Sequence, residues 1–371
     1  MKLSVSRDAF LARLGVAARG VSTRSSIQTL SGVRIGELDG GIELQATDME
    51  IGIRVKLEAD VESGTQPVVL PGRLLLDVVR SLPNDDLALE YRSQTQDVEI
   101  VSGPAKFHLR TLPTEDFPRL PEAGDARRIS VPAPAFIETV GRVGRAASRD
   151  EARPHLTGVL VEAGGNELRM VATDSYRLAV KETKLESAIA GEPFEANVPV
   201  RALQELTRIA AADGAEEIEI AKLENQVVFR AGDVVLSSRL IEGRFPNYKQ
   251  LLPETYEHEL RLGRGELLDV VKRISLMAQK NAPLRMKFED GALEVSAETP
   301  DIGEAREALP APFKGETLEI GFNPEFLQDG LDSAESDELI FKLISPHRPG
   351  LIQSGDDGGF IYLVMPVRLN V

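Results

Sequence analysis

Two Thr-Asp pairs are the first residues in this sequence whose types suggest chemistry. They stand in LQATDMEIGI (44–53) and MVATDSYRLAV (170–180), each at the end of an alternating apolar segment. A carboxylate beside a hydroxyl can serve as a general acid or base, or both groups can hydrogen-bond the backbone of a turn. The turn is the simpler hypothesis for Asp48 and Asp174, and an enzyme that uses these carboxylates is the alternative.

The sequence offers no other catalytic or ligand-binding signature. It has neither a G-x-x-x-x-G-K-[ST] loop nor a G-x-G-x-x-G after a strand, and its four histidines are scattered. The absence of cysteine excludes disulfides and thiolate metal sites. GDDGGF (355–360) is typical of a glycine-rich turn rather than a cation site. We therefore expect no catalytic residue, cofactor or metal.

The Thr-Asp pairs belong to segments that repeat along the chain at a regular spacing. Ala46 and Ala172 are 126 residues apart, and DGALEVSAET (290–299) is a weaker third relative, aligned at Ala297. Helix starts with a proline recur as VLPGRLLLDVVRSL (69–82), NVPVRALQELTRIA (197–210) and GFNPEFLQDGLDSA (321–334). Amphipathic segments recur at 6–21, 132–148 and 263–280, and strand-like runs at 107–118, 237–246 and 360–369.

These repeats predict an α+β fold of three similar domains, 1–125, 126–255 and 256–371. Each domain is expected to hold two helices and about eight short antiparallel strands, because period-two segments alternate with glycine, asparagine and aspartate turns. The repetition also argues against an enzyme, since active sites seldom occur in triplicate. Each Thr-Asp pair then marks an equivalent strand end.

Charge is distributed unevenly along the chain. The net charge is −16, which taken alone argues against a nucleic-acid partner. Five of the six predicted helices nevertheless carry fourteen Arg or Lys residues against six Asp or Glu, while the sixth (323–335) is acidic. Such arginine stripes suit either a solvated helix face or a surface for the phosphate backbone. With no Trp and five Tyr, base stacking is not expected.

Three further motifs carry a resemblance to a known family. VATDSYRLAV, LIEGRFPNYKQLLP (240–253) and YLVMPVRL (362–369), together with the threefold repeat, resemble the bacterial DNA polymerase III beta subunits, the sliding clamps. The resemblance covers the whole chain. It implies a processivity factor that forms a head-to-tail homodimeric ring, slides on duplex DNA without sequence specificity and has no catalysis of its own. The alternative is a repeat-built adaptor that binds peptides without encircling DNA.

A simple geometric argument agrees with two chains per ring. If helices spaced ~10 Å apart line a hole, six helices leave a gap of only about 9 Å. Duplex DNA, with a groove about 8.5 Å deep, does not fit. Twelve helices leave roughly 28 Å, which suffices. Because the ring holds DNA by topology, an acidic exterior with a mildly basic lumen is compatible with sliding.

The resemblance also implies partners and a location. Expected partners are duplex DNA, a second copy of the chain, a clamp loader, the DNA polymerase III alpha subunit, and other polymerases, repair proteins and ligases that carry clamp-binding peptides. No membrane partner is expected, because the N-terminus lacks an apolar signal core and the longest apolar run, 360–367, is too short to cross a bilayer. The expected location is the nucleoid of the cytoplasm.

The resemblance and the charge pattern together give three groups of site residues. DNA contacts are expected by resemblance at Arg24, Arg149 and Arg201, and from the arginine stripes of the predicted helices at Arg73, Arg80, Arg142 and Arg145. The partner-peptide pocket is expected to include Leu156, Thr173, Ser175, Tyr176, Arg177, Leu178, Pro246, Leu251, Asn323, Phe326, Val364, Met365, Pro366 and Arg368. The dimer interface is expected to include Lys106, Phe107, Leu109, Ile274, Leu276 and Glu304.

Some positions depart from the family's pattern. Ser175-Tyr176 stand where the family often has Gly-His, Gln250 occupies a pocket position, and Asn370-Val371 extend the usual end. Taken alone, Leu178 and Met365 would be interpreted as core residues. The first Thr-Asp copy continues as Met49-Glu50-Ile51-Gly52 without Arg-Leu, so it is not expected to bind a peptide.

Overall fold

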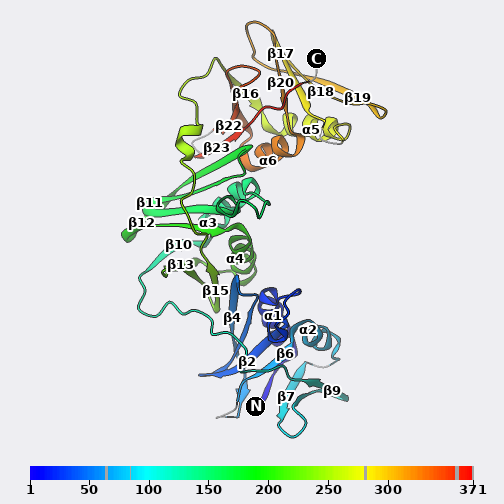
Figure 1. Ribbon diagram of the computed structural model, residues 1–371, viewed down its shortest axis with the longest axis vertical. Coiled ribbons are helices and arrows are strands. Elements are labelled where there is room, and N and C mark those ends of the chain that lie inside the picture. Colours follow the sequence, from blue (N-terminus) through cyan, green and yellow to red (C-terminus); the bar gives the residue numbers. More distant parts are fainter. Residues whose placement is uncertain (63–65, 84, 280–281, 356–358, 370–371) are drawn as a thin grey trace. The chain divides into compact units, whose positions relative to one another are not determined.

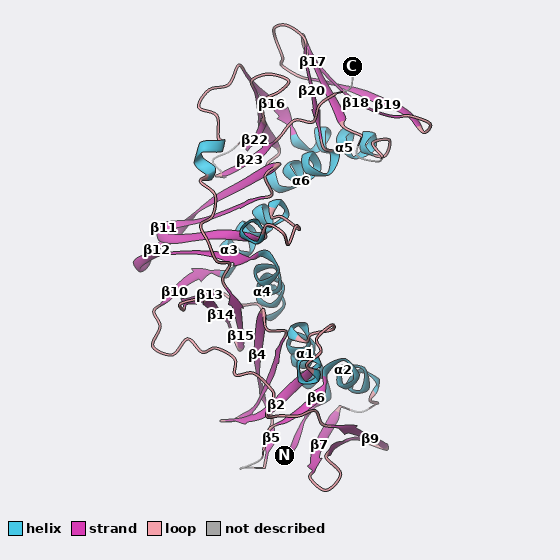
Figure 2. Cartoon of the chain, viewed as in Figure 1, coloured by secondary structure: helices cyan, strands magenta, loops and turns pink. Residues whose placement is uncertain are grey.

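The computed structural model describes residues 1–62, 66–83, 85–279, 282–355 and 359–369, without the side chains of 190–192. The Asn370-Val371 extension and residues 356–358 of GDDGGF lie outside these residues. The chain divides into two compact units, 1–134 with 201–240 and 135–200 with 241–371. In each unit, helices pack against antiparallel sheets (Figure 1, Figure 2).

The first unit contains two sheets and three helices. One sheet has the order β5-β1-β7-β8-β9 and the other β10-β13-β14-β15-β4-β3-β2-β6. The helices and 3-10 turns are α1 (Arg7–Ala17), η1 (Ala18–Gly20), η2 (Gln28–Ser31), α2 (Gly72–Ser81) and α4 (Val200–Asp213). The strands are β1 (Lys2–Ser6), β2 (Gly32–Leu38), β3 (Gly41–Thr47), β4 (Ile51–Glu58), β5 (Asp60–Val61), β6 (Val68–Pro71), β7 (Asp86–Arg92), β8 (Asp97–Ser102), β9 (Ala105–Arg110), β10 (Arg128–Pro132), β13 (Glu217–Lys222), β14 (Gln226–Ala231) and β15 (Val234–Arg239).

The second unit repeats this plan. Its sheets have the orders β11-β12-β23-β22-β21-β16 and β19-β18-β17-β20. The helices and 3-10 turns are α3 (Ala133–Val143), η3 (Gly144–Ala146), η4 (Pro154–Leu156), η5 (Tyr248–Leu251), α5 (Arg264–Ser275) and α6 (Pro324–Ala334). The strands are β11 (Gly158–Thr173), β12 (Arg177–Pro199), β16 (His258–Gly263), β17 (Leu284–Glu289), β18 (Ala292–Thr299), β19 (Gly303–Pro310), β20 (Leu318–Phe322), β21 (Glu338–Leu343), β22 (Gly350–Ser354) and β23 (Phe360–Val364).

The predicted pair of helices per repeat is confirmed, with six α-helices in the described part of the chain. Their ends follow from local chemistry. Ser6 caps α1 by accepting a hydrogen bond from the Ala9 N–H, and Asn323 caps α6 through the Phe326 N–H. Pro324 opens α6 as predicted, but Pro71 and Pro199 end strands β6 and β12 instead. A proline there still suits the first turn because it lacks the N–H that would stay unpaired.

The helices bury one apolar stripe each. Phe10, Leu14 and Ala17 of α1 are fully buried at helical spacing. Burying a large apolar side chain stabilises a fold by roughly 1.5–3 kcal/mol. The helix positions therefore follow from the same amphipathic pattern that repeats along the sequence.

The repeated Thr-Asp segments end three equivalent strands. The last residues of β3, β11 and β18 are Thr47, Thr173 and Thr299, each 126 residues from the next. The structure thus corrects the sequence alignment of the third copy, which placed Ala297 rather than Glu298 opposite Ala46 and Ala172. The third hairpin is one residue shorter, since Thr299 pairs with Gly303 whereas Thr47 pairs with Gly52.

Candidate functional site

The first two Thr-Asp segments form the same turn. The Asp48 carboxylate accepts hydrogen bonds from the Glu50 and Ile51 N–H groups at 3.0 and 2.9 Å. Asp174 accepts them from Tyr176 and Arg177 at 2.9 and 3.0 Å. The residue between, Met49 or Ser175, has a positive φ of 77° or 80°. The hydrogen bonds satisfy backbone donors that the tight turn would leave unpaired, so both aspartates serve as turn residues.

The two turns differ in the arginine that meets the second carboxylate oxygen. Asp48 pairs with Arg201 at 2.6 Å, and the Arg201 side chain is 48% exposed. Asp174 pairs with Arg177 at 3.0 Å, and the Arg177 side chain is 4% exposed. Arg177 stands at the position that Ile51 occupies in the first turn. The second turn therefore has a buried charge in its own strand, and the first has none.

The Arg177 guanidinium is bound on every side. It donates to the Arg145 carbonyl and the Asp329 carboxylate, both at 2.6 Å, and lies 4.3 Å above the Phe326 ring. Burial lowers the pKa of Arg177, but the neighbouring Tyr362 and Asp329 outweigh it and raise the pKa above its ordinary value. Burial also raises the pKa of Tyr362, which keeps that phenol neutral. Arg177 is thus a permanent cation that ties the turn to α6 and η3.

A pocket of about 760 Å³ lies beside the second turn. Its walls come from the turn, from the linker that contains η5, from the β21–β22 loop and from β23. It is lined by Thr173, Ser175, Arg177, Leu178, Lys249, Gln250, Leu251, Leu252, Pro253, Glu254, His347, Arg348, Pro349, Leu363 and Met365. This volume and its mixture of aliphatic walls and polar groups suit a short peptide with apolar anchors.

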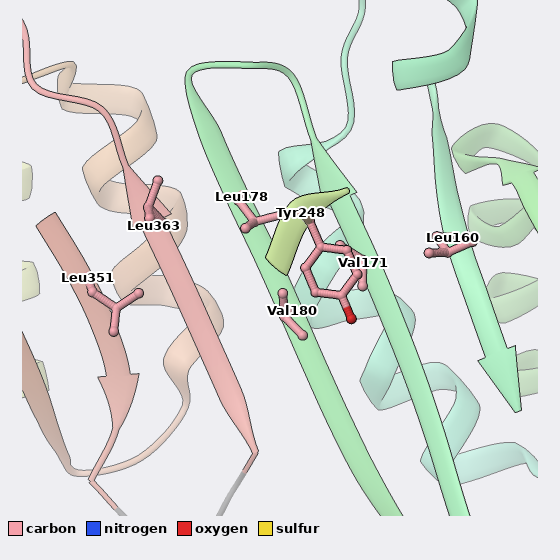
Figure 3. Close-up of a cluster of buried hydrophobic side chains, with 7 residues drawn as sticks. All are labelled: Leu160, Val171, Leu178, Val180, Tyr248, Leu351 and Leu363. Atoms are coloured by element: carbon pink, nitrogen blue, oxygen red, sulfur yellow. The ribbon is translucent and has the colours of Figure 1, made fainter. Parts of the chain in front are cut away.

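The pocket has a floor of packed, buried side chains. Leu178 and Leu363, which both line it, belong to a buried cluster that also contains Val171, Val180 and Tyr248. Figure 3 shows the Tyr248 side chain lying over the β11–β12 hairpin beside Val171 and Val180. The Tyr248 anchor holds the η5 linker against this sheet, and Leu251, next along the linker, remains 49% exposed.

The first turn has almost no pocket. The hollow beside it measures about 70 Å³ and is lined partly by the linker residues 118–121. Leu120 packs so close that a Cβ added to Gly52 would lie 2.8 Å from its Cδ2 atom. The linker therefore fills the space that is open beside the second turn.

A short insertion explains the difference between the linkers. The first reads Phe-Pro-Arg-Leu-Pro (117–121), whereas the second reads Phe-Pro-Asn-Tyr-Lys-Gln-Leu-Leu-Pro (245–253). The four extra residues fold into η5. Because Tyr248 then inserts into the core, the linker runs around the second turn instead of across it.

The structure gathers six of the fourteen predicted pocket residues: Thr173, Ser175, Arg177, Leu178, Leu251 and Met365. Two other predicted residues, Tyr176 and Phe326, support the turn by stacking on each other, with 6.4 Å between their ring centroids. Leu156 and Val364 are buried, and Asn323 caps α6. Pro246, Pro366 and Arg368 do not line the hollow.

Sequence reasoning missed part of the pocket wall. Lys249, Leu252, Pro253 and Glu254 lie inside or beside the LIEGRFPNYKQLLP motif, so the motif could have indicated them. Leu363 adjoins Val364 in the strand but faces the opposite side of the sheet. His347, Arg348 and Pro349 carry no sequence signal, because only the pairing of β22 with β23 brings their loop to the site.

The arginines predicted to contact DNA differ in whether they already form ion pairs with carboxylates of the chain. Arg24 and Arg73 are exposed, and neither has a carboxylate within 4.0 Å in the described part of the chain. Arg149 is 87% exposed and lies 3.8 Å from Glu325. Arg80 pairs with Asp77, and Arg201 pairs with Asp48 and Glu50. Arg24, Arg73 and Arg149 are therefore the arginines most available to a phosphate.

The remaining two arginines hold helices together. Arg142 is 12% exposed and pairs with Glu335 at 2.5 Å, while Arg145 pairs with Asp329 and Asp332. Their partners are Asp329 and Asp332 of α6 and Glu335, the residue that ends this helix. The acidic sixth helix, which broke the pattern of basic helices, is thus the docking partner of Arg142 in α3 and Arg145 in η3. In the first unit, Asp213 and Glu205 of α4 accept Arg13 and Arg19 in the same way.

The predicted interface residues fall into two groups. Phe107 and Leu276 are 36% and 73% exposed, whereas Leu109 and Ile274 are 5% and 4% exposed and belong to the core of their own units. Lys106 is exposed near Glu99, and Glu304 pairs with Arg306. Sequence reasoning did not single out Leu74 and Ile302, which are 52% and 43% exposed.

Two other kinds of site, a metal site and a membrane span, have no candidate among the described residues. Among the described residues, no group of three or more His, Asp or Glu is arranged to hold a metal ion. No described helix has the length and apolarity that a membrane span requires.

Comparison with known families decides the classification. Three family models match in order: the DNA polymerase III beta subunit N-terminal domain at 1–121, its central domain at 130–247 and its C-terminal domain at 249–368. The chain belongs to the DNA polymerase III beta subunit family. The three-domain fold is thereby confirmed, and the boundaries at 125 and 255 stay predictions.

Individual relatives agree with this family. The chain is 32% identical to the beta sliding clamp of Staphylococcus aureus over 99% of both chains. It matches the DNA polymerase sliding clamp structure from Bacillus subtilis with a TM-score of 0.93 at 29% identity, covering 100% of both chains. The DNA polymerase III beta subunit from Thermotoga maritima gives 0.90 at 27% identity and the same coverage. The sliding-clamp function is thus supported over the adaptor, and a non-catalytic accessory subunit is consistent with this family.

Proposed function

We propose that two copies of this chain close head to tail into a ring that encloses duplex DNA and presents the pocket beside Asp174 to partner peptides. The observation that carries the proposal is a pair of unpaired sheet edges. β9 is the edge of one sheet in the first unit, and β19 is the edge of another in the second. Inside the chain, the strands equivalent to β9 and β19 are already joined to each other, twice.

The two internal junctions define how the third would form. In the first unit β15 pairs antiparallel with β4, and in the second β23 pairs antiparallel with β12. In both junctions, the last strand of one repeat pairs with the strand that follows a Thr-Asp turn. The last strands are β15, before the second linker, and β23, before the chain end. β9 precedes the first linker, and β19 follows the third turn. Pairing of β9 with β19 of a second copy repeats the same junction and closes a heterologous ring.

The internal registers predict the register of the third junction. Val235 lies opposite Arg54, and Ile361 lies opposite Val180. The equivalent residues of β9 and β19 are Lys106 and Ala305, so these should lie opposite each other across the interface. Phe107 would then face Glu304, and Ile302 would be covered as Ile51 is covered in the first unit, where it is 2% exposed.

The helix layer supports the same closure. Arg19 and Arg145 stand equally far beyond the first residues of α1 and α3. Each pairs with the acid at the same position in the second helix of the following repeat, Glu205 of α4 or Asp329 of α6. The corresponding residues at the open ends are Leu276 and Asp77. A leucine that is 73% exposed in place of the paired arginine indicates an apolar contact with another copy.

Cysteine crosslinking tests the register directly, because the natural chain has no cysteine. Lys106→Cys with Ala305→Cys should give a covalent dimer on oxidation, since opposite residues in a sheet lie about 4.5–5.5 Å apart at Cβ. Lys106→Cys with Glu307→Cys is the matched control, whose diagonal distance exceeds disulfide reach. Equal crosslinking of both pairs, or a monomer at micromolar concentration, would contradict the ring.

DNA contact in this ring is expected to be weak and independent of sequence. Most helix arginines are already paired with carboxylates. Arg24, Arg73 and Arg149, whose pair with Glu325 is long at 3.8 Å, are the principal phosphate ligands. Arg145 binds a phosphate only in competition with Asp329 and Asp332. Few phosphate contacts mean little counterion release, so affinity at physiological salt is low and sliding is not impeded. The enclosure, rather than the contacts, would keep the protein on DNA.

The pocket supports recognition of peptides from replication and repair proteins. Its apolar residues Leu178, Leu251 and Leu363 would take apolar anchors, and Met365 adapts to their shape. Candidate partners are the polymerase III alpha subunit, other polymerases, repair proteins and ligases, with a clamp loader to open the ring. In this function the chain tethers enzymes and performs no reaction itself, and its place of action is the nucleoid.

A further inference from the structure

Asp329 connects the peptide pocket to the surface that faces the proposed DNA. One carboxylate oxygen of Asp329 accepts from the Arg177 guanidinium at 2.6 Å. The other accepts from Arg145 at 3.4 Å. Arg177 lines the pocket, whereas the Arg145 side chain is 51% exposed. A single carboxylate is therefore shared between a buried pocket residue and an exposed cation.

The pocket turn depends on the Arg177 end of this connection. Arg177 holds the Asp174 carboxylate through its Nε atom at 3.0 Å, and that carboxylate accepts the Tyr176 and Arg177 N–H groups. The Tyr176 carbonyl in turn accepts from the N–H of the pocket residue Met365 at 2.8 Å. Any change in how firmly Asp329 holds Arg177 thus reaches two walls of the pocket.

The Arg145 end is open to competition. Arg145 also pairs with Asp332 at 3.0 Å, so its charge is divided between two acids. A phosphate that approaches this exposed guanidinium competes with both carboxylates, because the hydrogen bond from a guanidinium N–H to a phosphate oxygen is charge-assisted and strong. When Arg145 turns to a phosphate, Asp329 is left with Arg177 as its cation.

The described residues of the first unit show no such connection. The acid equivalent to Asp329 is Glu205, which pairs with Arg19 and Arg208. Ile51 replaces Arg177 in the first turn and carries no group that could bind an acid. In the part of the chain that the structure describes, a carboxylate shared between a pocket residue and an exposed cation occurs at the junction that has the pocket.

We propose that Asp329 is a positioning residue for the peptide pocket, and that phosphate contact at Arg145 strengthens its hold on Arg177 and thereby orders the pocket for a peptide. This rests on the proposed DNA contact. Because coupling between two ligands is reciprocal, a bound peptide also releases Arg145 for DNA. A ring on DNA would then bind partners more tightly than a free ring.

Hydrogen exchange on the full-length protein tests this without a known peptide. The probe is a 20-base-pair DNA duplex of arbitrary sequence at low salt, and its binding is followed separately by fluorescence anisotropy. The readout is amide exchange at Tyr176 and Arg177. Saturating duplex should slow this exchange about 5-fold in the natural protein, at the lower end of typical coupling strengths.

Four variants separate coupling from general stability. In Arg145→Ala the duplex should still bind through the other arginines. Its addition should no longer alter amide exchange at Tyr176 and Arg177 of that variant. Asp332→Asn is the matched control, since Asp332 contacts Arg145 but not Arg177, and it should retain the response. Asp329→Asn should exchange faster and lose the response, and Asp329→Glu should restore it in part.

The outcomes distinguish the two proposals. Duplex binding with no change at Tyr176 and Arg177 in the natural protein overturns the coupling but leaves DNA contact standing. No duplex binding overturns both. A response that persists in Arg145→Ala also contradicts the coupling, because the signal would then reach the pocket by another route.

Discussion

The turns at Asp48 and Asp174 have the same backbone conformation but differ in how closely the neighbouring linker packs against them. Each aspartate accepts two N–H groups of its own turn, and each turn precedes a strand that joins one repeat to the next. Beside the first, the linker leaves about 70 Å³, and beside the second it leaves about 760 Å³. The pocket beside the second turn thus comes from a different neighbouring linker, while the backbone of the turn itself is the same in both repeats.

The largest difference between the turns should appear on removal of their arginines. Arg177→Ala would leave Asp174 and Asp329 without their buried cation, which should lower the free energy of unfolding by about 3–5 kcal/mol. Arg201→Ala removes a half-exposed partner of Asp48 and should cost less than about 1 kcal/mol. Urea unfolding, followed separately for each transition, measures both. Equal losses would show that the two pairs are equivalent after all.

A second comparison sets the open junction against an internal one. Leu276→Asp removes an apolar contact and places a carboxylate near Asp77 of the other copy, which should weaken the dimer by about 3 kcal/mol, or two orders of magnitude in Kd. Arg19→Ala, at the equivalent position of the first internal junction, should leave dimerisation unchanged. Sedimentation equilibrium checks both variants, and an unaltered dimer in Leu276→Asp would contradict the proposed interface.

The pockets can be compared through two exposed methionines. Met365 and Met49 are 40% and 44% exposed beside the second and first turns. Met365→Ala should weaken partner binding about 30-fold, the effect of losing roughly 2 kcal/mol at a central contact. Met49→Ala should have no effect. Labelled peptides that tile the polymerase III alpha subunit provide the anisotropy assay, and similar losses in both variants would place the peptide elsewhere.

The smallest expected effect concerns the arginines at the proposed DNA surface. Arg24→Ala should reduce the slope of log K against log salt by about 0.9, the value for one phosphate contact. Arg142→Ala should leave this slope unchanged and lower stability instead, because Arg142 holds α6 through Glu335 and the Ser333 carbonyl. A changed slope in Arg142→Ala would mean that this helix junction opens on DNA.

Much of this architecture could be predicted from the sequence. The helix pairs follow from the spacing of residues such as Phe10 and Leu14, and the Thr-Asp turns follow from the local chemistry of aspartate. The sequence also pointed to Thr173, Leu178 and Met365 through the motifs around them. Each of these signals lies within a short stretch of chain.

What could not be predicted depends on contacts between distant segments. The arginine stripe at 142, 145 and 149 looked like a phosphate surface, yet Arg142 pairs with Glu335 and Arg145 with Asp329 and Asp332, acids 184 to 193 residues away. The loop from His347 to Pro349 lies at the pocket because β22, which follows it, pairs with β23. Periodicity reports which face of a helix is polar but does not report what that face meets.

Topological retention on DNA tests the central proposal most directly. The protein would be loaded on nicked circular DNA with a clamp loader and ATP, closed through Lys106→Cys and Ala305→Cys, and washed at high salt. The ring should remain on the circle and leave when the DNA is linearised. Loss from the intact circle, or retention after linearisation, would contradict a ring that encloses DNA.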